Sequence, residues 1–129
     1  MRFLPLVGVM ALIFLLSHIP GRNLPEAAIF AQDKFCHALA YATLAAAALW
    51  AWLPQVKKRP RSALGAILLF CLLYGISDEF HQSFIPGRYS SLADIGADVM
   101  GAALFLWGWR SWYARKAYNG SCKHKPDCQ

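Results

Sequence analysis

Charged residues are scarce in this sequence of 129 residues. Asp, Glu, Lys and Arg together make up only 16% of it, whereas roughly 25% is ordinary for a soluble domain. Hydrophobic residues reach 57%, and the mean hydropathy is +0.35. So little polar surface excludes a soluble enzyme, a disordered tail and a disulfide-stapled secreted miniprotein. The length and composition predict one domain embedded in a membrane, and we expect no nucleic-acid partner.

Several motifs of enzymes and metal sites are also missing. The sequence has no serine nucleophile elbow, no glycine-rich phosphate loop and no catalytic cysteine motif. Four residues of the C-terminal tail have metal-ligand side chains: Cys122, His124, Asp127 and Cys128. Their spacing matches no common zinc pattern. We therefore expect no cofactor and no metal in the tail.

Four apolar segments are each suited to cross a bilayer, which takes about 20 residues at ~1.5 Å rise per residue. They cover residues 3–19, 35–53, 63–84 and 92–113. Such segments must be helical, because lipid offers no hydrogen-bond partner to free backbone groups. The sequence thus predicts an all-α integral membrane bundle of four transmembrane helices over residues 1–113, followed by a basic cytoplasmic tail over residues 114–129.

Basic residues are distributed unevenly between the two ends of this bundle. Three lie at one end: Arg22, Lys34 and Arg88. Ten lie at the other: Arg2, Lys57, Lys58, Arg59, Arg61, Arg110, Arg115, Lys116, Lys123 and Lys125. The positive-inside rule places the second end, and with it both termini, in the cytoplasm. All five tryptophans lie near that end, as an interfacial belt would.

The first segment has an alternative interpretation as a signal peptide cleaved near Ala31. Ile29 fits poorly at the minus-three position, where a small residue is expected. Pro20 and Gly21 are better explained as a helix stop. Cleavage would leave the orientation of the other three helices unchanged.

The acidic residues carry most of the functional information. Six of the seven lie in the half away from the basic end: Glu26, Asp33, Asp78, Glu79, Asp94 and Asp98. A carboxylate in a bilayer costs several kcal/mol, so such residues are usually paired, solvated or functional.

Helical spacing gathers polar side chains on one face of each of three helices. The stripes are Asp33, His37 and Tyr41 on the second helix; Tyr74, Asp78, His81 and Gln82 on the third; and Asp94 and Asp98 on the fourth. Counting helical turns places all three stripes at one level of the outer leaflet. We expect Arg88, in the loop above, to lie over the acidic cluster, because its planar fork suits carboxylate or phosphate.

Three blocks in this region follow one another: Asp33-Lys34-x-x-His37-x-x-x-Tyr41, then Ser77-Asp78-Glu79-x-His81-Gln82-x-Phe84-x-Pro86-Gly87-Arg88, then Asp94-x-x-x-Asp98-x-x-Gly101. In residue type, order and spacing they resemble the VanZ-like membrane protein family. The resemblance implies a protein of the bacterial cell envelope, in the inner membrane, because the founding member is linked to low-level teicoplanin resistance. This sequence has Asp98 where the family usually has Asn. A second carboxylate beside Asp94 must be protonated, solvated or bridged by a cation.

The residues leave three interpretations of the polar cluster open. The cluster could only lock the helices together, at about 0.6 kcal/mol per hydrogen-bonded pair. It could belong to an enzyme acting on a phosphorylated lipid or lipid-linked cell-wall intermediate. It could also belong to a binding module that sequesters or moves an anionic lipid or a glycolipopeptide antibiotic. Oligomeric state is left open by the sequence.

For a functional site, the candidate residues divide into two groups. Acid–base roles fall to Glu79, His81, His37 and Asp78, because buried carboxyl and imidazole groups can titrate near neutrality. The predicted ligand-binding residues are Arg88, Lys34, Asp33, Asp94, Asp98, Gln82 and Tyr41. A metal held by His37, Glu79, His81 and Asp94 is a weaker variant, since no HExxH spacing is present.

Overall fold

The computed structural model describes residues 1–19, 29–88 and 90–122, and the side chains of these ranges except 29–33 and 120–122. Its helices are α1 (Leu4–Ser17), α2 (Ile29–Ala51), α3 (Leu53–Lys58), α4 (Pro60–Gln82) and α5 (Leu92–Cys122). The predicted all-α class is therefore confirmed for the described chain. The side chain of Asp33, residue Glu26 and the metal-ligand side chains of the tail lie outside it.

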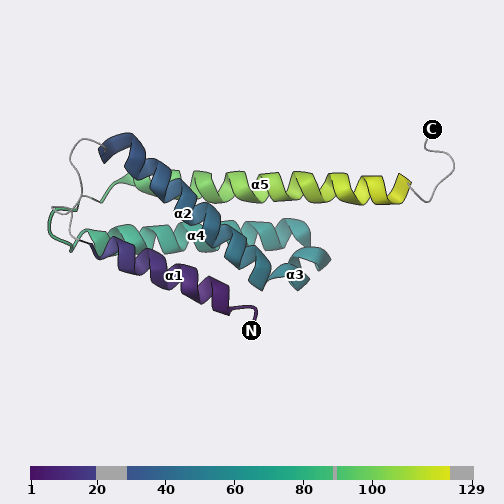
Figure 1. Ribbon diagram of the computed structural model, residues 1–129, viewed down its shortest axis with the longest axis horizontal. Helices are drawn as coiled ribbons and strands as arrows, with labels where there is room; N and C mark the ends of the chain where they lie inside the picture. The colour runs from purple at the N-terminus through teal and green to yellow at the C-terminus, as the bar shows by residue number, and fades with distance from the viewer. Residues whose placement is uncertain (20–28, 89, 123–129) are drawn as a thin grey trace.

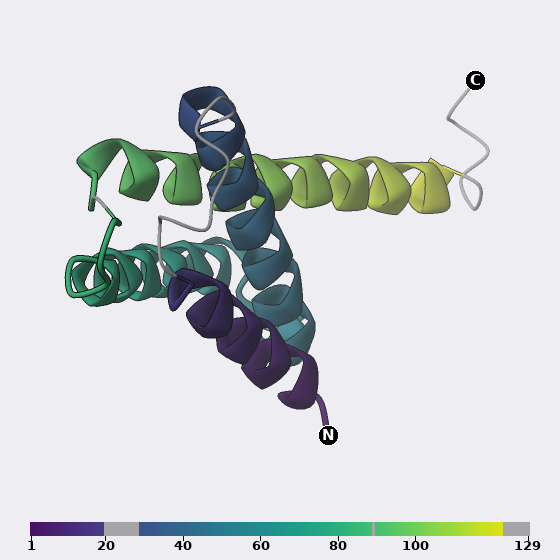
Figure 2. The same ribbon diagram turned by 60° about the vertical axis from the view of Figure 1, so that its left-hand side comes forward.

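Helices α4 and α5 lie along the bundle, and α1 and α2 are inclined to them. In Figures 1 and 2, α4 and α5 lie along the molecule, while α1 and α2 run obliquely to them. α2 contacts α1, α4 and α5, and its most extensive contact is with α5. Residues on α2 can therefore face a cleft on one side and α5 on the other.

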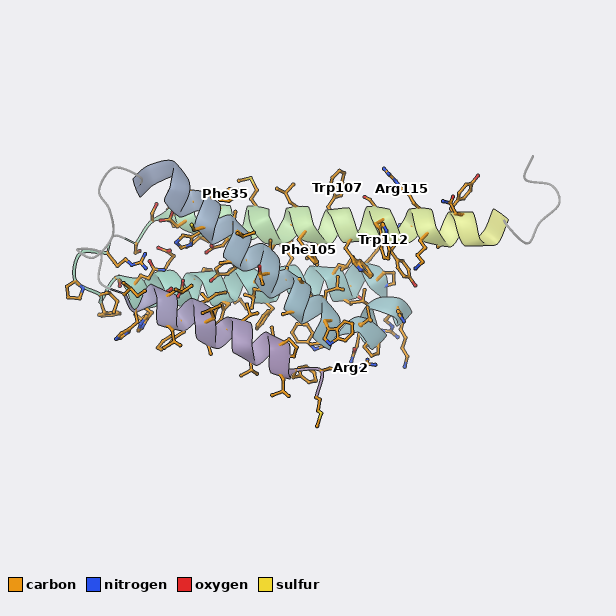
Figure 3. The ribbon with its side chains drawn as sticks, in the orientation of Figure 1. Arg2, Phe35, Phe105, Trp107, Trp112 and Arg115 are labelled. Atoms are coloured by element: carbon orange, nitrogen blue, oxygen red, sulfur yellow. The ribbon has the colours of Figure 1, made fainter. Side chains whose placement is uncertain are left out.

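Within the described ranges, two helices are long and apolar enough to span a membrane, namely α4 and the Leu92–Asn119 part of α5. Only 28% and 33% of their most apolar windows are buried inside the protein. Their exposed faces carry large apolar side chains at helical spacing: Leu69, Leu73, Ile76 and Phe80 on α4, and Met100, Leu104 and Trp107 on α5. Figure 3 shows Phe35 and Trp107 directed away from the bundle. Continuous apolar faces of this kind suit lipid rather than water.

Proline ends α2 and starts a short helix where the sequence predicted a basic loop. Pro54 has no N–H to donate to the carbonyl of Trp50, so the α2 hydrogen-bond ladder cannot continue. The chain then forms α3, which buries Val56 and ends before Pro60, the first residue of α4. Proline is tolerated at that first position because its missing N–H has no partner there in any helix.

The last helix is longer than its apolar run. The sequence predicted an end near Tyr113, whereas α5 has 31 residues and ends at Cys122. At ~1.5 Å per residue this is ~46 Å, well beyond the ~30 Å of a bilayer core. The additional turns carry Arg115 and Lys116, and the Lys116 ammonium lies 5.1 Å from the centroid of the Trp112 ring. Composition marked where the apolar stretch ends, and the helix continues past it.

The backbones of α2 and α5 approach closely at Ala38 and Gly101. A methyl group on Gly101 would overlap the backbone carbonyl of Ala38, so only glycine fits at this position. Deeper in the bundle the contact continues through fully buried small side chains, including Ala45 and Ala48 on α2 and Ala102 on α5. Small residues let helix backbones approach closely in membranes.

We predict that Gly101→Ala lowers the melting temperature of the purified protein by several degrees, because overpacking of this kind costs about 1–3 kcal/mol. Gly108→Ala on the same helix is the matched control, since no atom lies within 4 Å of its added methyl group. Alanine favours a helix over glycine by up to about 1 kcal/mol, so the control should melt at the same temperature or higher. Equal melting temperatures for the two variants would contradict the close contact.

Candidate functional site

One end of the bundle collects polar side chains from four helices. The C-terminal ends of α1 and α4 meet the N-terminal ends of α2 and α5 there, at the left of Figure 1. The sequence predicted three of these contributions. The fourth comes from Ser17 and His18 at the end of α1, which the sequence analysis did not single out.

Two polar side-chain pairs connect α2 to α5. The ammonium of Lys34 donates to Asp94 Oδ1 at 2.6 Å, and Nδ1 of His37 lies 2.9 Å from Asp98 Oδ1. The Lys34 side chain is 26% exposed and that of His37 is 11% exposed, whereas the aspartates are 6% and 1% exposed. Both carboxylates are therefore buried with a cationic or hydrogen-bonding partner, as burial of charge requires.

These two pairs explain how Asp98 is accommodated beside Asp94. A second carboxylate beside Asp94 was expected to need a proton, solvent or a bridging cation. The structure instead gives each aspartate its own partner on α2, because Lys34 and His37 follow one another along α2 as Asp94 and Asp98 do along α5. His37 is the group that makes an aspartate acceptable at position 98.

Asp78 belongs to a separate hydrogen-bonded group between α4 and α1. Ser17 Oγ donates to Asp78 Oδ2 at 2.9 Å, and Gln82 Nε2 donates to the same oxygen at 3.0 Å. Gln82 Nε2 also lies 3.2 Å from Ser17 Oγ. All three residues are buried. The stripe predicted on the third helix thus uses Asp78 and Gln82 to hold the end of α1.

Glu79 holds the start of α5. Its Oε2 accepts a hydrogen bond from the backbone N–H of Ser91 at 2.8 Å, and Ser91 Oγ in turn accepts from the N–H of Ala93 at 3.1 Å. Ser91 therefore caps α5 in the usual way of a serine at a helix N-terminus. A carboxylate from α4 fixes that cap, which explains why an acidic residue is present at position 79.

Among the described residues, three buried side-chain polar atoms lack a hydrogen-bond partner: Tyr41 Oη, Glu79 Oε1 and Asp98 Oδ2. Two of them lie beside Gly75, where an added Cβ would be 3.0 Å from Asp98 Oδ2 and 3.5 Å from Tyr41 Oη. Gly75 thus leaves the space into which the Asp98 carboxyl group extends. Each unsatisfied buried polar atom costs about 1–3 kcal/mol of folding free energy. Such a cost is more typical of a functional site than of a contact that only joins helices.

A cleft of about 280 Å³ opens between α1, α2 and α4. Its apolar wall consists of Ile13, Leu16, Ile19, Cys36 and Ala40. Its polar lining consists of Ser17, His37, Tyr41, Asp78, Gln82 and Arg88. The cleft therefore joins a hydrocarbon-like surface to a compact set of hydrogen-bonding and charged groups.

Arg88 lies at this cleft but not over the carboxylates as predicted. Its Nη2 donates to the carbonyl of Leu16 at 3.0 Å and its Nε to the carbonyl of Ile19 at 3.2 Å. No ion pair joins Arg88 to a carboxylate among the described residues. The expected contact is corrected for a physical reason: the last carbonyls of a helix have no partners within it and accept hydrogen bonds from basic side chains. Pro86 and Gly87 form a tight turn before Arg88, in which Gly87 has a φ of 77° and the Arg88 N–H donates to the carbonyl of Ile85 at 3.1 Å.

His81 is also placed differently from the prediction. Its Nε2 lies 3.2 Å from Nδ1 of His18, and its ring packs against Phe14 with centroids 4.7 Å apart. It is therefore on the side of α4 that faces α1, outside the cleft lining. The metal site considered for His37, Glu79, His81 and Asp94 does not form, and no other group of three such ligands is present in the described part of the chain.

Five of the predicted residues line the cleft: His37, Tyr41, Asp78, Gln82 and Arg88. The other predicted residues whose side chains are described lie around the cleft. Asp98 lies behind His37, and the Lys34–Asp94 pair lies between α2 and α5. Glu79 contacts the start of α5, and His81 packs against α1. The three predicted stripes meet at one end of the bundle, and the predicted single cluster is divided into separate hydrogen-bonded groups.

Comparison with known sequences adds a family to this geometry. Searches of the curated proteins and of the solved structures each returned no significant match. The sequence model of the VanZ/LLP1 family matches residues 3–113, which include α1 to α4 and most of α5. Because that match covers most of the chain and contains every residue of the cleft, this protein belongs to the VanZ family.

Proposed function

We propose that this protein binds the polar end of an amphiphile in the cleft between α1, α2 and α4. The ligand class is a phosphorylated membrane lipid, a lipid-linked cell-wall intermediate or a glycopeptide antibiotic with a lipid tail. The observation that carries the proposal is the cleft itself, which has an apolar wall beside Asp78, His37 and Arg88. Ligand sites commonly combine an apolar lining with a few convergent polar groups.

The size of the cleft limits what it can hold. At about 280 Å³ it is slightly smaller than the 300–1,000 Å³ typical of small-molecule pockets. It suits a headgroup or the first few methylene groups of a chain, while the remainder stays in the bilayer. The unpaired apolar faces of α4 and α5 are consistent with such surroundings.

We also propose that the protein crosses the bacterial plasma membrane four times, with both termini in the cytoplasm. α1 has only 14 residues, but it is joined to α4 by the hydrogen bond of 2.7 Å from Tyr74 Oη to the carbonyl of Met10. Figure 3 shows Arg2 and Arg115 toward the end of the bundle that carries α3, away from the acidic end. Basic residues at one end and carboxylates at the other support this orientation.

A second candidate function is purely structural, and a specific observation favours it. Ser17, Asp78 and Gln82 satisfy one another, and Arg88 already bonds two carbonyls of α1. Such contacts alone would hold the end of α1 against α4. The two functions differ in one respect: a structural lock needs no access from outside, whereas a binding cleft must admit a ligand.

Cys36 provides a direct test of ligand entry, because it is exposed and lines the cleft. In protein whose Cys122 and Cys128 are replaced by Ser, we expect a maleimide to label Cys36 in phosphatidylcholine nanodiscs. Dioctanoyl phosphatidylglycerol, farnesyl phosphate or teicoplanin should slow that labelling at least threefold if it enters the cleft. Unchanged labelling with all three amphiphiles would favour the structural function.

Filling the cleft should abolish this protection. Ala40 lines the cleft and is half-buried, so Ala40→Trp should occupy the space that the ligand needs. Ala66→Trp on the exposed face of α4 is the matched control and should retain protection. If overproduction of the protein raises teicoplanin tolerance of a bacterial host, only Ala40→Trp should remove that effect. Protection that survives Ala40→Trp would place the ligand elsewhere.

The orientation is tested by accessibility of single cysteines in intact cells. With native cysteines removed, Ser90→Cys should react with a membrane-impermeant maleimide, because Ser90 is exposed at the outer end. Lys58→Cys, exposed beside α4 at the basic end, should react only after the cells are opened. Labelling of Lys58→Cys in intact cells would invert the proposed topology.

A further inference from the structure

We propose that His18 and His81 together bind a divalent transition-metal ion of the zinc type, and that the bound ion ties the end of α1 to the end of α4. One imidazole nitrogen from each residue is a ligand, and water completes the coordination. The inference does not depend on amphiphile binding in the cleft.

The distance between the two imidazoles is the first argument. Nδ1 of His18 lies 3.2 Å from Nε2 of His81, although the two residues belong to the ends of different helices. Zinc binds histidine nitrogen at about 2.0–2.1 Å, so two nitrogens of one tetrahedral site are about 3.3–3.4 Å apart. The fold therefore already holds the nitrogens at nearly the separation that one ion requires. The ion replaces the hydrogen atom between them, and both rings turn so that their lone pairs converge on it.

The access and the support of the two rings are the second argument. His18 is exposed and His81 is half-buried, so an ion from water can reach both. The ring of Phe14 packs beside both imidazoles, with centroid distances of 6.2 Å to His18 and 4.7 Å to His81. Side chains that are held in place before binding lose less conformational freedom when a ligand arrives.

The electrostatics of the helix ends are the third argument. His81 is in the last turn of α4, and His18 is the first residue after α1. The C-terminal end of a helix carries a partial negative charge, and two such ends meet at this position. Asp78 and Arg88 contact the residues on either side of His18, and their opposite charges oppose each other. The two helix ends therefore favour a cation between the imidazoles.

Helix packing alone explains little of this pair. Other hydrogen bonds already join α1 to α4, namely those among Ser17, Asp78 and Gln82 and the one from Tyr74 to the carbonyl of Met10. A hydrogen bond between two imidazoles at the surface adds little to them, because water competes for the same groups. Two adjacent imidazole nitrogens that are open to water are instead suited to chelate an ion.

The ligand atoms determine which ions can bind. Imidazole suits Zn²⁺, Cu²⁺ and Ni²⁺, whereas Mg²⁺ and Ca²⁺ prefer oxygen ligands. Two protein ligands leave the other positions to water, so the ion exchanges with solution and is not a permanent part of the fold. His18 lies between Ser17 and Ile19, which line the cleft. A bound ion therefore acts as a removable clip on the α1 wall of the cleft.

Titration with Zn²⁺ tests the site directly. The reference protein is the full chain, purified without a histidine tag, in which competing ligands are removed by Cys36→Ser, Cys122→Ser, His124→Gln and Cys128→Ser. We expect it to bind one Zn²⁺ per chain at micromolar concentration and to release the ion to EDTA. An excess of Mg²⁺ should not compete. A requirement for millimolar Zn²⁺ would overturn the site.

Single variants show whether the two imidazoles share one ion. In the reference protein, His18→Gln and His81→Gln should each weaken Zn²⁺ binding at least tenfold, because either change leaves a single ligand. Cu²⁺, which binds such ligands more tightly than Zn²⁺, should show EPR splitting from two nitrogens in the reference protein and from one fewer in each variant. His37 is retained in all three proteins, so it contributes equally to each. Binding that survives either change would overturn the shared site.

The melting temperature tests the tie between the helices. An ion that binds only the folded protein stabilises it, so excess Zn²⁺ should raise the melting temperature of the reference protein and not that of His18→Gln or His81→Gln. Binding of one Zn²⁺ without this rise would overturn the tie between α1 and α4. If one variant fails to fold, the other variant and the EPR spectrum of the reference protein still decide the proposal. None of these measurements uses protection of Cys36, so the metal site and the amphiphile cleft can fail separately.

Discussion

The contact between the backbones of α2 and α5 at Ala38 and Gly101 determines the geometry of the polar end. Because Gly101 has no side chain, the two helices approach closely enough for Asp98 to reach His37 at 2.9 Å. Asp94, one turn earlier, reaches Lys34 in the same way. A wider separation would leave two buried carboxylates without partners, and each would then carry the full cost of its desolvation.

This dependence makes the polar end cooperative. Packing places the aspartates, and the aspartates in turn hold α2 against α5 at the polar end, where Glu79 fixes the cap of α5. The same arrangement separates the carboxyl group of Asp98 from the cleft and leaves the imidazole ring of His37 in the cleft lining.

The sequence predicted which residues share a helix face better than it predicted which residues they contact. Four-residue spacing correctly placed His37 and Tyr41 on one face, and Asp94 and Asp98 on another, because periodicity fixes angles around a helix axis. Periodicity does not say which neighbour occupies each angle. Asp78 and His81 are three residues apart, so they lie about 60° apart around α4, and that angle separates the cleft from the Phe14 side of α1.

The polar side chains that α1 contributes could not be predicted from helical spacing. Ser17 and His18 follow an uninterrupted apolar run, so neither belongs to a polar stripe whose period could reveal a face. The carbonyl groups of Leu16 and Ile19, at and just after the end of α1, compete with carboxylates for the guanidinium of Arg88. A carbonyl lacks the full charge of a carboxylate, so Arg88 attached to α1 is not neutralised by these two contacts. The loop that carries Arg88 thereby holds the end of α1 beside the cleft.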